Sequence, residues 1–305
     1  MKHGRYLLTL VGLLSLVSVP LAQESACNPT NLPLQLGQLA AVHPIDGCRC
    51  SGAPKGEAGS QIRTANDFQN SIKNNFMRST NNPKRIGIAD MARLQEKVNA
   101  FSMEQLPRGD RLTLPSPDQR TLLSNISLGP NKTFSEGDVV TIAGFVLGAR
   151  HSNLEDGESV NCEKPGCATN DVHIELASHP RNPHMTKAEQ MNTEGIDVEI
   201  SPRHRPDAWD RFDSSSYINV FKTHPVAFTG QLFYDASHSP GGGPVRVSVW
   251  EVHPIYAIWV CRKTTPQACP MDQLTDESVW LPFHKLQSFL HLSTVQVTEA
   301  CQENP

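Results

Sequence analysis

The sequence predicts a mainly β protein built around a five-stranded barrel, with helices ahead of it. Several segments alternate apolar and polar residues with the period of two that marks half-buried strands. Their order is three strands, a short helical crossover and two strands, which is the order of the oligonucleotide/oligosaccharide-binding (OB) Greek-key barrel. Gly144 and Gly230 interrupt two of these strands, as bulges or bends do in a closing barrel. A generic five-stranded sheet or sandwich is the alternative.

Residues 1–22 have the features of a cleaved secretory signal. Lys2 and Arg5 give a basic start, an apolar run covers 7–21, and a small residue precedes the expected cleavage point. An uncleaved anchor and a lipid-anchored Cys27 are the alternatives, but the apolar run is short for a membrane span. We therefore expect a secreted or periplasmic protein with no transmembrane segment in the mature chain.

Residues 23–60 are rich in proline, glycine and small polar residues, and we expect them to form an irregular arm. Two helices are predicted next, over 64–80 and 87–101, because apolar residues recur there at helical spacing. Thr64 is the expected N-cap of the first helix. The two helices should form a hairpin, so that arm and hairpin together make a unit over 23–106.

The stretch 107–135 is rich in proline and serine and is expected to be a linker, followed by the barrel over 136–262. The expected barrel elements are five strands with one short helix between the third and the fourth: Val139–Leu147, Asp171–Ala177, Ile196–Ile200, the helix within Asp207–Phe221, Val226–Asp235 and Val245–Val260. The last strand should break at Pro254. Residues 263–305 are expected to be a carboxyl-terminal extension.

The eight cysteines, an even number in an exported chain, favour disulfides: Cys27, Cys48, Cys50, Cys162, Cys167, Cys261, Cys269 and Cys301. Cys162 and Cys167 flank a turn sequence, and Cys261 and Cys269 flank a polar loop, so we expect a local bridge in each place. The other four would tie the chain ends together in one of three connectivities. Zinc is the alternative, which the one-residue gap at 48–50 disfavours.

The charge of the chain disfavours nucleic-acid binding. The sequence has 27 basic and 31 acidic residues, and loss of Lys2 and Arg5 with the signal leaves a net charge of −6. Nucleic-acid affinity depends on neutralising phosphates, for which such a chain is poorly suited.

One face of the second and third strands is the first candidate for ligand binding. If the apolar residues of these strands point inward, the outer face carries acids and an imidazole: Asp171, His173, Glu175, Asp197 and Glu199. Carboxylates at this density repel one another unless a cation lies among them. We expect a divalent cation or a basic ligand there. The alternative is a solvated face, partly neutralised by basic residues of the chain: Lys187, Arg203 and Arg205.

The second candidate is a group of histidines and carboxylates on the second, fourth and fifth strands. Alternation puts Glu251 and His253 on one side of the last strand. The OB order makes the fourth strand its neighbour, so Asp235 and His238 should approach this pair, and His173 completes the set. Three imidazoles with carboxylates suit zinc or another transition metal, and imidazoles suit acid–base catalysis. A buried hydrogen-bond network is the structural alternative.

Residues 136–261 also contain four groups of short motifs: Gly137-Asp138-Val139-Val140 with Gly144-Phe145-Val146, Asn170-Asp171-Val172-His173-Ile174, Thr229-Gly230-Gln231-Leu232-Phe233-Tyr234-Asp235 with His238, and Trp250-Glu251-Val252-His253-Pro254. These motifs resemble those of a group of bacterial exported proteins of uncharacterised function. The resemblance covers under half of the chain. It implies an OB-like barrel and implies no activity.

From the sequence we expect an exported, non-catalytic binding module whose ligand is a polymer or an envelope protein. A metal-dependent hydrolase built on His173, His238, Glu251 and His253 is the second hypothesis, and single-stranded nucleic-acid binding is the third. The sequence contains no nucleophile elbow, zinc-protease motif, phosphate loop or dinucleotide fingerprint. It names no cofactor beyond the divalent cation.

Overall fold

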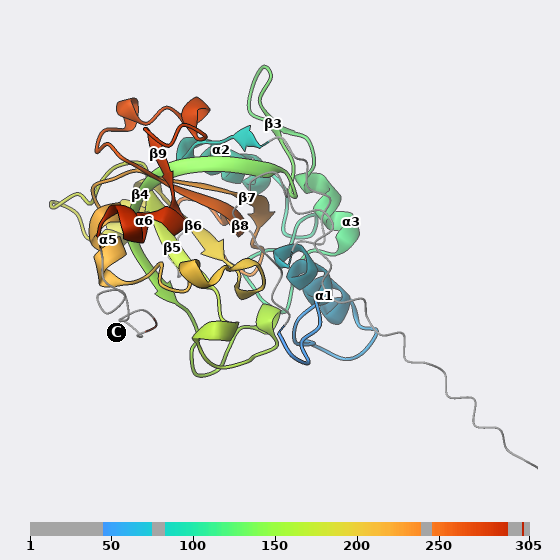
Figure 1. Ribbon diagram of the computed structural model, residues 1–305. Helices are drawn as coiled ribbons and strands as arrows, with labels where there is room; N and C mark the ends of the chain where they lie inside the picture. The colour runs from blue at the N-terminus through green and yellow to red at the C-terminus, as the bar shows by residue number, and fades with distance from the viewer. Residues whose placement is uncertain (1–44, 75–82, 239–245, 292–300, 302–305) are drawn as a thin grey trace, which may run out of the picture.

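The computed structural model describes residues 45–74, 83–238, 246–291 and 301. The predicted signal, over 1–22, and the start of the expected arm lie outside these residues. A β-barrel occupies the centre of the molecule, with helices and loops around it (Figure 1). Among the residues described, no helix is long and apolar enough to cross a membrane.

Five strands form the barrel: β4 (Val139–His151), β5 (Val172–Ala177), β6 (Gly195–Ile200), β7 (Val226–Tyr234) and β8 (Trp250–Cys261). β4, β5 and β6 pair antiparallel in succession, β6 runs parallel to β8, and β8 is antiparallel to β7. β7 then pairs with β4, which closes the barrel. The crossover helix α5 (Ser215–Phe221) lies between β6 and β7. The predicted mainly β fold and the OB-like strand order are confirmed.

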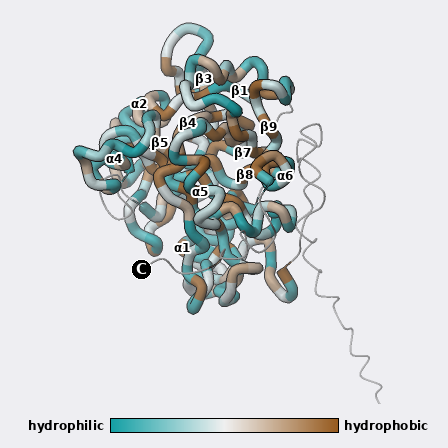
Figure 2. The backbone as a smooth tube through the Cα atoms, turned by 60° about the vertical axis from the view of Figure 1, so that its left-hand side comes forward, coloured by the Kyte–Doolittle hydropathy of each residue, from teal (hydrophilic) through white to brown (hydrophobic). Residues whose placement is uncertain are grey.

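The inward faces of the strands make the core. In β5, Val172, Ile174 and Leu176 are fully buried, as their alternation predicts. Hydrophobic stretches concentrate on the central strands, and hydrophilic stretches on the surrounding loops (Figure 2). Each such side chain contributes about 1.5–3 kcal/mol through burial. The alternating residues therefore fix which side of each strand faces outward.

Gly230 lies where the pairing of β7 with β8 shifts register. A Cβ at this position would lie 2.4 Å from the carbonyl oxygen of Pro254, so the strands approach too closely there for a side chain. β8 does not break at Pro254, as the sequence suggests, but continues to Cys261. The register shift between β7 and β8 therefore lies at Gly230, opposite the proline.

Gly144 also marks a close approach, since a Cβ there would lie 2.5 Å from the carbonyl oxygen of Ala177. The register shift of β4 falls a few residues later, between Val146 and Gly148. The bulge expected at Gly144 is thus displaced along the strand, and Gly144 instead allows β4 and β5 to pass near each other.

The first helix, α1 (Gln61–Lys73), begins earlier than predicted. Its N-cap is Ser60, not Thr64, because the Ser60 side chain accepts a hydrogen bond from the backbone N–H of Arg63. The far end of the predicted helix, beyond residue 74, lies outside the described part of the chain. The buried face of α1 is largely polar and includes Asn66, Gln69 and Asn70.

The second helix, α2 (Ile88–Asn99), buries the predicted apolar stripe, including Met91, Leu94 and Val98. α2 packs against β6 and β8, whereas α1 packs against the short helix η3 (Ser159–Asn161). The two helices lie apart in both views (Figures 1 and 2), so the expected hairpin is wrong. Only α2 has an apolar stripe that joins the barrel core, while α1 binds the outside of the barrel through polar groups.

The segment 107–135, expected to be a linker, is part of the packed domain. It contains α3 (Pro117–Arg120), η2 (Thr121–Leu123) and an antiparallel pair, β2 (Ile126–Ser127) with β3 (Thr133–Phe134). Leu123, Leu128 and Phe134 are buried in the main core. The linker prediction fails because apolar residues spaced irregularly among prolines and serines still anchor the segment.

The remaining elements extend or cover the barrel. Before β4, β1 (Lys84–Arg85) pairs with it in parallel. After β8, β9 (Trp280–Pro282) pairs antiparallel with β8, so the expected carboxyl-terminal extension continues the sheet. The other short elements are η4 (Cys167–Thr169), α4 (Lys187–Glu194), η5 (Pro202–His204), η6 (Asp207–Trp209), η7 (Pro266–Ala268), η8 (Met271–Gln273), η9 (Phe283–Lys285) and α6 (Leu286–Phe289).

Disulfides join distant parts of the chain. Cys261–Cys269 is the local bridge that the sequence predicts. The expected bridge between Cys162 and Cys167 is wrong, because Cys162 bonds to Cys48 and Cys167 bonds to Cys301. Cys162 and the residue after it both have positive φ, and this turn directs the two cysteines to different neighbours. Cys50 is disulfide-bonded too, and Cys27 lies outside the described residues.

Candidate functional site

The outer face of β5, β6 and β8 carries a buried group of charged and polar side chains, here called the polar cluster: Lys73, Glu158, Asp171, His173, Asp197, Glu199, Asp235, His238, Arg246, Glu251 and His253. Strand register assembles it, since His173 lies opposite Glu199 on β5 and β6. The parallel pairing of β6 with β8 brings His253 alongside. Both groups of residues that the sequence singles out therefore contribute to one cluster.

The N-terminal segment covers this face. α1 docks there through Gln231, whose side-chain nitrogen donates to the carbonyl oxygen of Ile72 at 2.8 Å. The side chains of Asn70 and Asn74 donate hydrogen bonds to the carbonyl oxygens of Ser51 and Cys50, respectively. These hydrogen bonds hold residues 50–53 against α1. The candidate face is therefore an interior layer between the barrel and α1.

Asp171, Glu199 and His253 form an inner triad at the centre of the cluster. One ligand atom from each lies within 4.8 Å of the others, and all three residues are buried. His253 Nε2 is 3.6 Å from Asp171 Oδ2, and His253 Nδ1 is 2.6 Å from Glu199 Oε2. Neither contact has hydrogen-bond geometry, so these four atoms have no hydrogen-bond partner among the described residues.

Glu158, Asp171 and His173 form an outer triad, with ligand atoms also within 4.8 Å of one another. Here a hydrogen bond joins His173 Nε2 to Glu158 Oε1 at 3.0 Å, and His173 Nδ1 lies 3.4 Å from Glu199. The His173 side chain is 21% exposed and that of Glu158 is 14% exposed. The outer triad is thus the part of the cluster that reaches the surface.

Two cations of the chain itself enter the cluster. Lys73, the last residue of α1, places Nζ 3.1 Å from Asp235 Oδ2 and 4.0 Å from Glu199 Oε2. Arg246 Nη1 lies 2.7 Å from Glu251 Oε1 and also contacts Asp197. The basic partner that the acidic face requires is supplied in part from within the molecule.

The outer triad is arranged as a charged pair. Burial alone would lower the pKa of His173, but the charge of Glu199 and the hydrogen bond to Glu158 raise it to about 10. Burial alone would raise the pKa of Glu158, but the hydrogen bond and charge of His173 lower it to about 2. At neutral pH the imidazole of His173 is therefore protonated and the carboxyl group of Glu158 is ionised.

In the inner triad, the pKa shifts of His253 and Asp171 are the reverse of those of His173 and Glu158. Burial lowers the pKa of His253, so its ring is neutral and one nitrogen keeps a free lone pair. Burial, with the charges of Glu158 and Glu199, raises the pKa of Asp171 well above its usual range. Burial and the charge of Glu199 do the same for the pKa of Glu251. Burial is thus the main reason why the pKa values of these two carboxyl groups are raised.

The structure separates some of the predicted residues. Glu175 lies at the edge of the face and pairs with Lys187 at 2.7 Å, as one alternative from the sequence proposes. Asp197 meets Arg246, and His238 reaches only Asp235, with Nε2 3.6 Å from Oδ2. Burial lowers the pKa of His238. Arg203 and Arg205 are directed elsewhere, to backbone carbonyl oxygens at 49, 167 and 170.

Three important residues of the cluster were not identified from the sequence. Glu158 lies in a loop with no periodic pattern, and Arg246 lies ahead of β8, so neither carries a signal of its own. Lys73 follows Gln69 by four residues, which places both on one face of α1. The four-residue spacing of Gln69 and Lys73 was the available signal for a polar face of α1. The sequence alone does not show which part of the protein this face contacts.

No protein-family model matches this chain, and the comparisons with curated proteins and with solved structures also find no match. The resemblance of residues 136–261 to bacterial exported proteins therefore stays a prediction. What the fold and the site define is a class: a mainly β, disulfide-bonded protein with a closed five-stranded barrel and a buried polar cluster on its outer face.

Proposed function

We propose that this chain is an exported, non-catalytic binding protein that holds a divalent transition-metal ion in the inner triad. The proposal rests on ligand atoms of Asp171, Glu199 and His253 that are buried, lie within 4.8 Å of one another and make no hydrogen bond within the part of the chain that the structure describes. Buried polar atoms without partners are costly, and a bound cation would satisfy all three side chains at once.

The composition of the triad selects the class of metal. One imidazole and two carboxylates suit zinc, manganese or iron(II), whereas calcium and magnesium favour all-oxygen sites. The neutral ring of His253 is the form that binds a metal. Glu251 lies 3.9 Å from His253 Nδ1 and offers a further carboxylate beside the triad.

Thermal unfolding with Zn²⁺, Mn²⁺ or Ca²⁺ tests the proposal. A site-bound ion at 100 times its Kd stabilises the folded state by about 2.7 kcal/mol, which raises the Tm by several degrees. We expect this rise with Zn²⁺ or Mn²⁺, and a smaller one or none with Ca²⁺. The Glu199→Gln variant should lose this rise in Tm, because an amide oxygen without a negative charge replaces a carboxylate ligand of the metal.

Glu175→Gln is the matched control, since Glu175 belongs to the same face but pairs with Lys187. This variant should keep the full metal-induced rise in Tm. Elemental analysis of the purified wild-type protein gives an independent reading of bound metal. An unchanged Tm with every ion, or equal rises in Glu199→Gln and wild type, would refute the proposal.

The second candidate function is a metal-dependent hydrolase, and the exposure of the outer triad favours it. A metal ion held by Glu158 and His173 would be reachable by solvent and could carry a reactive water. The strong pairing of these two side chains weighs against it, because a protonated His173 offers no lone pair. Hydrolase activity that depends on His173 but survives Glu199→Gln would favour this candidate.

A polymer or envelope protein as ligand remains an expectation from the sequence. In OB-like barrels the face of the second and third strands binds oligonucleotides and oligosaccharides, and here α1 and residues 50–53 lie over that face. We therefore place a macromolecular partner elsewhere on the surface. The acidic character of the chain continues to disfavour nucleic acid.

A further inference from the structure

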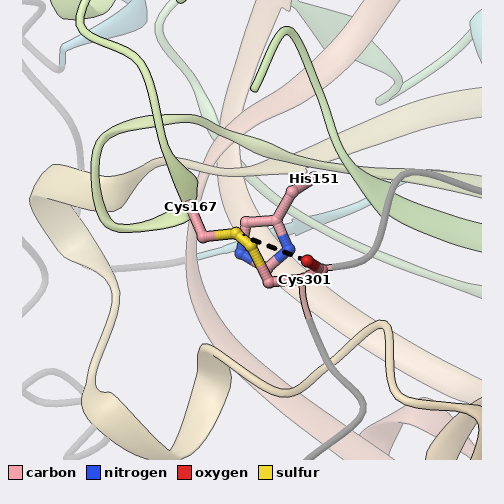
Figure 3. Close-up of side chains that lie close together, drawn as sticks. All are labelled: His151, Cys167 and Cys301. Carbon is pink, nitrogen blue, oxygen red and sulfur yellow. Dashed lines mark hydrogen bonds between the residues drawn. A yellow bond between two sulfur atoms is a disulfide. The ribbon is translucent and has the colours of Figure 1, made fainter. Parts of the chain in front are cut away.

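A second polar constellation lies near the start of β5, where His151 pairs with Val172. His151 ends β4, Asp213 precedes α5, and the disulfide between Cys167 and Cys301 lies beside the imidazole of His151 (Figure 3). One ring nitrogen of His151 and both sulfur atoms lie within 4.8 Å of one another. The disulfide thus shares its immediate surroundings with a titratable side chain.

Asp213 holds the imidazole in place. Its Oδ2 lies 2.7 Å from His151 Nδ1 and also accepts a hydrogen bond from the backbone N–H of His151 at 3.2 Å. The side chain of His151 is fully buried, and its Nε2 has no hydrogen-bond partner among the described residues. A carboxylate on Nδ1 fixes the orientation of the ring, as in enzymes where an imidazole transfers protons to and from a nucleophile.

The two sulfur atoms belong to partly exposed residues, whereas both cysteines of the Cys261–Cys269 bridge are buried. A partner thiolate must approach a sulfur atom to exchange with a disulfide. Exposure and a neighbouring imidazole together are the microenvironment of reactive rather than structural cysteines.

We propose that Cys167–Cys301 is a thiol–disulfide exchange site that oxidises dithiols, with His151 as the proton-transfer group and Asp213 as the residue that positions it. One thiol of the dithiol gives its proton to His151 and attacks one sulfur of the bridge. This forms a mixed disulfide and releases the other cysteine as a thiolate, which takes the proton back from His151. The second thiol of the substrate gives its proton to His151 in the same way, attacks the substrate sulfur of the mixed disulfide and releases the first cysteine, which takes that proton. The substrate loses two electrons and two protons and becomes a disulfide, and the protein gains both as two thiols.

The first test measures how fast each bridge of the folded protein is reduced by dithiothreitol, with alkylation and peptide mapping to identify the opened pair. We expect Cys167–Cys301 to open at least about tenfold faster than Cys261–Cys269. Cys261–Cys269 is the internal control, because Cys48–Cys162 has a cation of its own, with Arg203 Nη2 2.9 Å from Cys48 Sγ. Equal rates for Cys167–Cys301 and Cys261–Cys269 would overturn the proposal.

The second test replaces the proton-transfer group. His151→Gln should slow the opening of Cys167–Cys301 by about tenfold or more and leave Cys261–Cys269 unchanged. In redox buffers the equilibrium constant for its reduction should stay at the wild-type value, because a proton-transfer group changes the rate of exchange and not its equilibrium. If His151→Gln does not fold, Asp213→Asn serves the same purpose and should slow opening in the same direction. Wild-type opening rates in a folded variant would overturn the proposal and show that the bridge is only structural.

Discussion

The carboxylate of Asp235 makes several of the contacts between α1 and the barrel. Its Oδ2 lies 3.1 Å from Lys73 Nζ, and its Oδ1 accepts hydrogen bonds from Gln69 and from the backbone N–H of Ser237. Gln69 and Lys73 are four residues apart and lie on one face of the helix. Much of the docking of α1 is therefore concentrated on one residue.

Asp235→Asn should destabilise the protein because it leaves the buried ammonium group of Lys73 without its nearest partner. Removal of one member of a buried ion pair costs about 3 kcal/mol. Urea unfolding of wild type and variant at pH 7 measures this difference in the free energy of unfolding. Ser237→Ala is the control, because it removes one hydroxyl hydrogen bond to the same carboxylate and keeps the ion pair, and it should cost only about 1 kcal/mol.

The same Asp235→Asn variant should show a characteristic dependence on pH. Burial alone would raise the pKa of Asp235, but Lys73 holds it well below its ordinary value of 3.8. A lowered pKa contributes stability above the unfolded-state value, and this contribution is lost as the pH falls toward the folded-state value. The stability difference between wild type and Asp235→Asn should thus be constant from pH 7 to about 5 and shrink below pH 3.8. A difference that stays constant down to about pH 2 would contradict this account.

At the residue scale, the sequence could identify much of the candidate site. Strict alternation placed His173 and Glu199 on the outer face, and the predicted neighbourhood of strands brought His253 toward them. Lys73 and Glu158 could not be identified in this way, because their approach depends on contacts of the helix and loop with distant strands. Periodicity shows which way a side chain points but not what lies opposite it.

At the scale of elements, close approach of β4 and β5 depends on a residue without a side chain. A Cβ at Gly144 would lie 2.5 Å from the carbonyl oxygen of Ala177, a backbone atom that cannot rotate away. Gly144→Ala should therefore cost about 1–3 kcal/mol in the free energy of unfolding. Gly87→Ala is the control, since its nearest contact would be 3.4 Å away, at an Asp90 side chain, and its cost should be at most about 1 kcal/mol. Equal losses of unfolding free energy in the two variants would show that the close approach of β4 and β5 at Gly144 leaves room for a side chain.

The two N-terminal helices show where prediction of elements ends. Each helix forms because its apolar residues recur at helical spacing. The apolar stripe of α2 packs against the barrel core, as its pattern predicts. The pairing of the helices with each other was predicted from their proximity in sequence, and that rule failed. α1 has a buried face rich in amides, and such a face is satisfied by backbone carbonyl oxygens and barrel side chains, not by an apolar helix.

At the scale of the whole molecule, disulfides of very different span should contribute differently to stability. Cys48–Cys162 joins residues 114 apart in sequence, whereas Cys261–Cys269 joins residues 8 apart. The entropy of loop closure predicts losses of about 5 and about 2.5 kcal/mol when the two bridges are removed. Thermal or urea unfolding of the double Ser variants, Cys48→Ser with Cys162→Ser and Cys261→Ser with Cys269→Ser, checks the order. A larger loss from the short bridge would contradict it.

The architecture of the barrel was predictable because its order follows from five patterned segments and one crossover helix. The layers around it were not, since they depend on pairings such as Cys48 with Cys162 that join residues distant in sequence. Local spacing favoured the nearer pair, Cys162 with Cys167, but backbone direction decides which sulfur atoms meet.

The bridges Cys48–Cys162 and Cys167–Cys301 enclose two consecutive stretches that together make up most of the chain. A protease that cuts once anywhere within 49–161 or 168–300 leaves fragments that are still covalently joined. The nicked protein would migrate as a single band on a gel without reductant and as two bands after reduction. Proteolytic damage of this kind is therefore hidden from any gel that is run on the oxidised molecule alone.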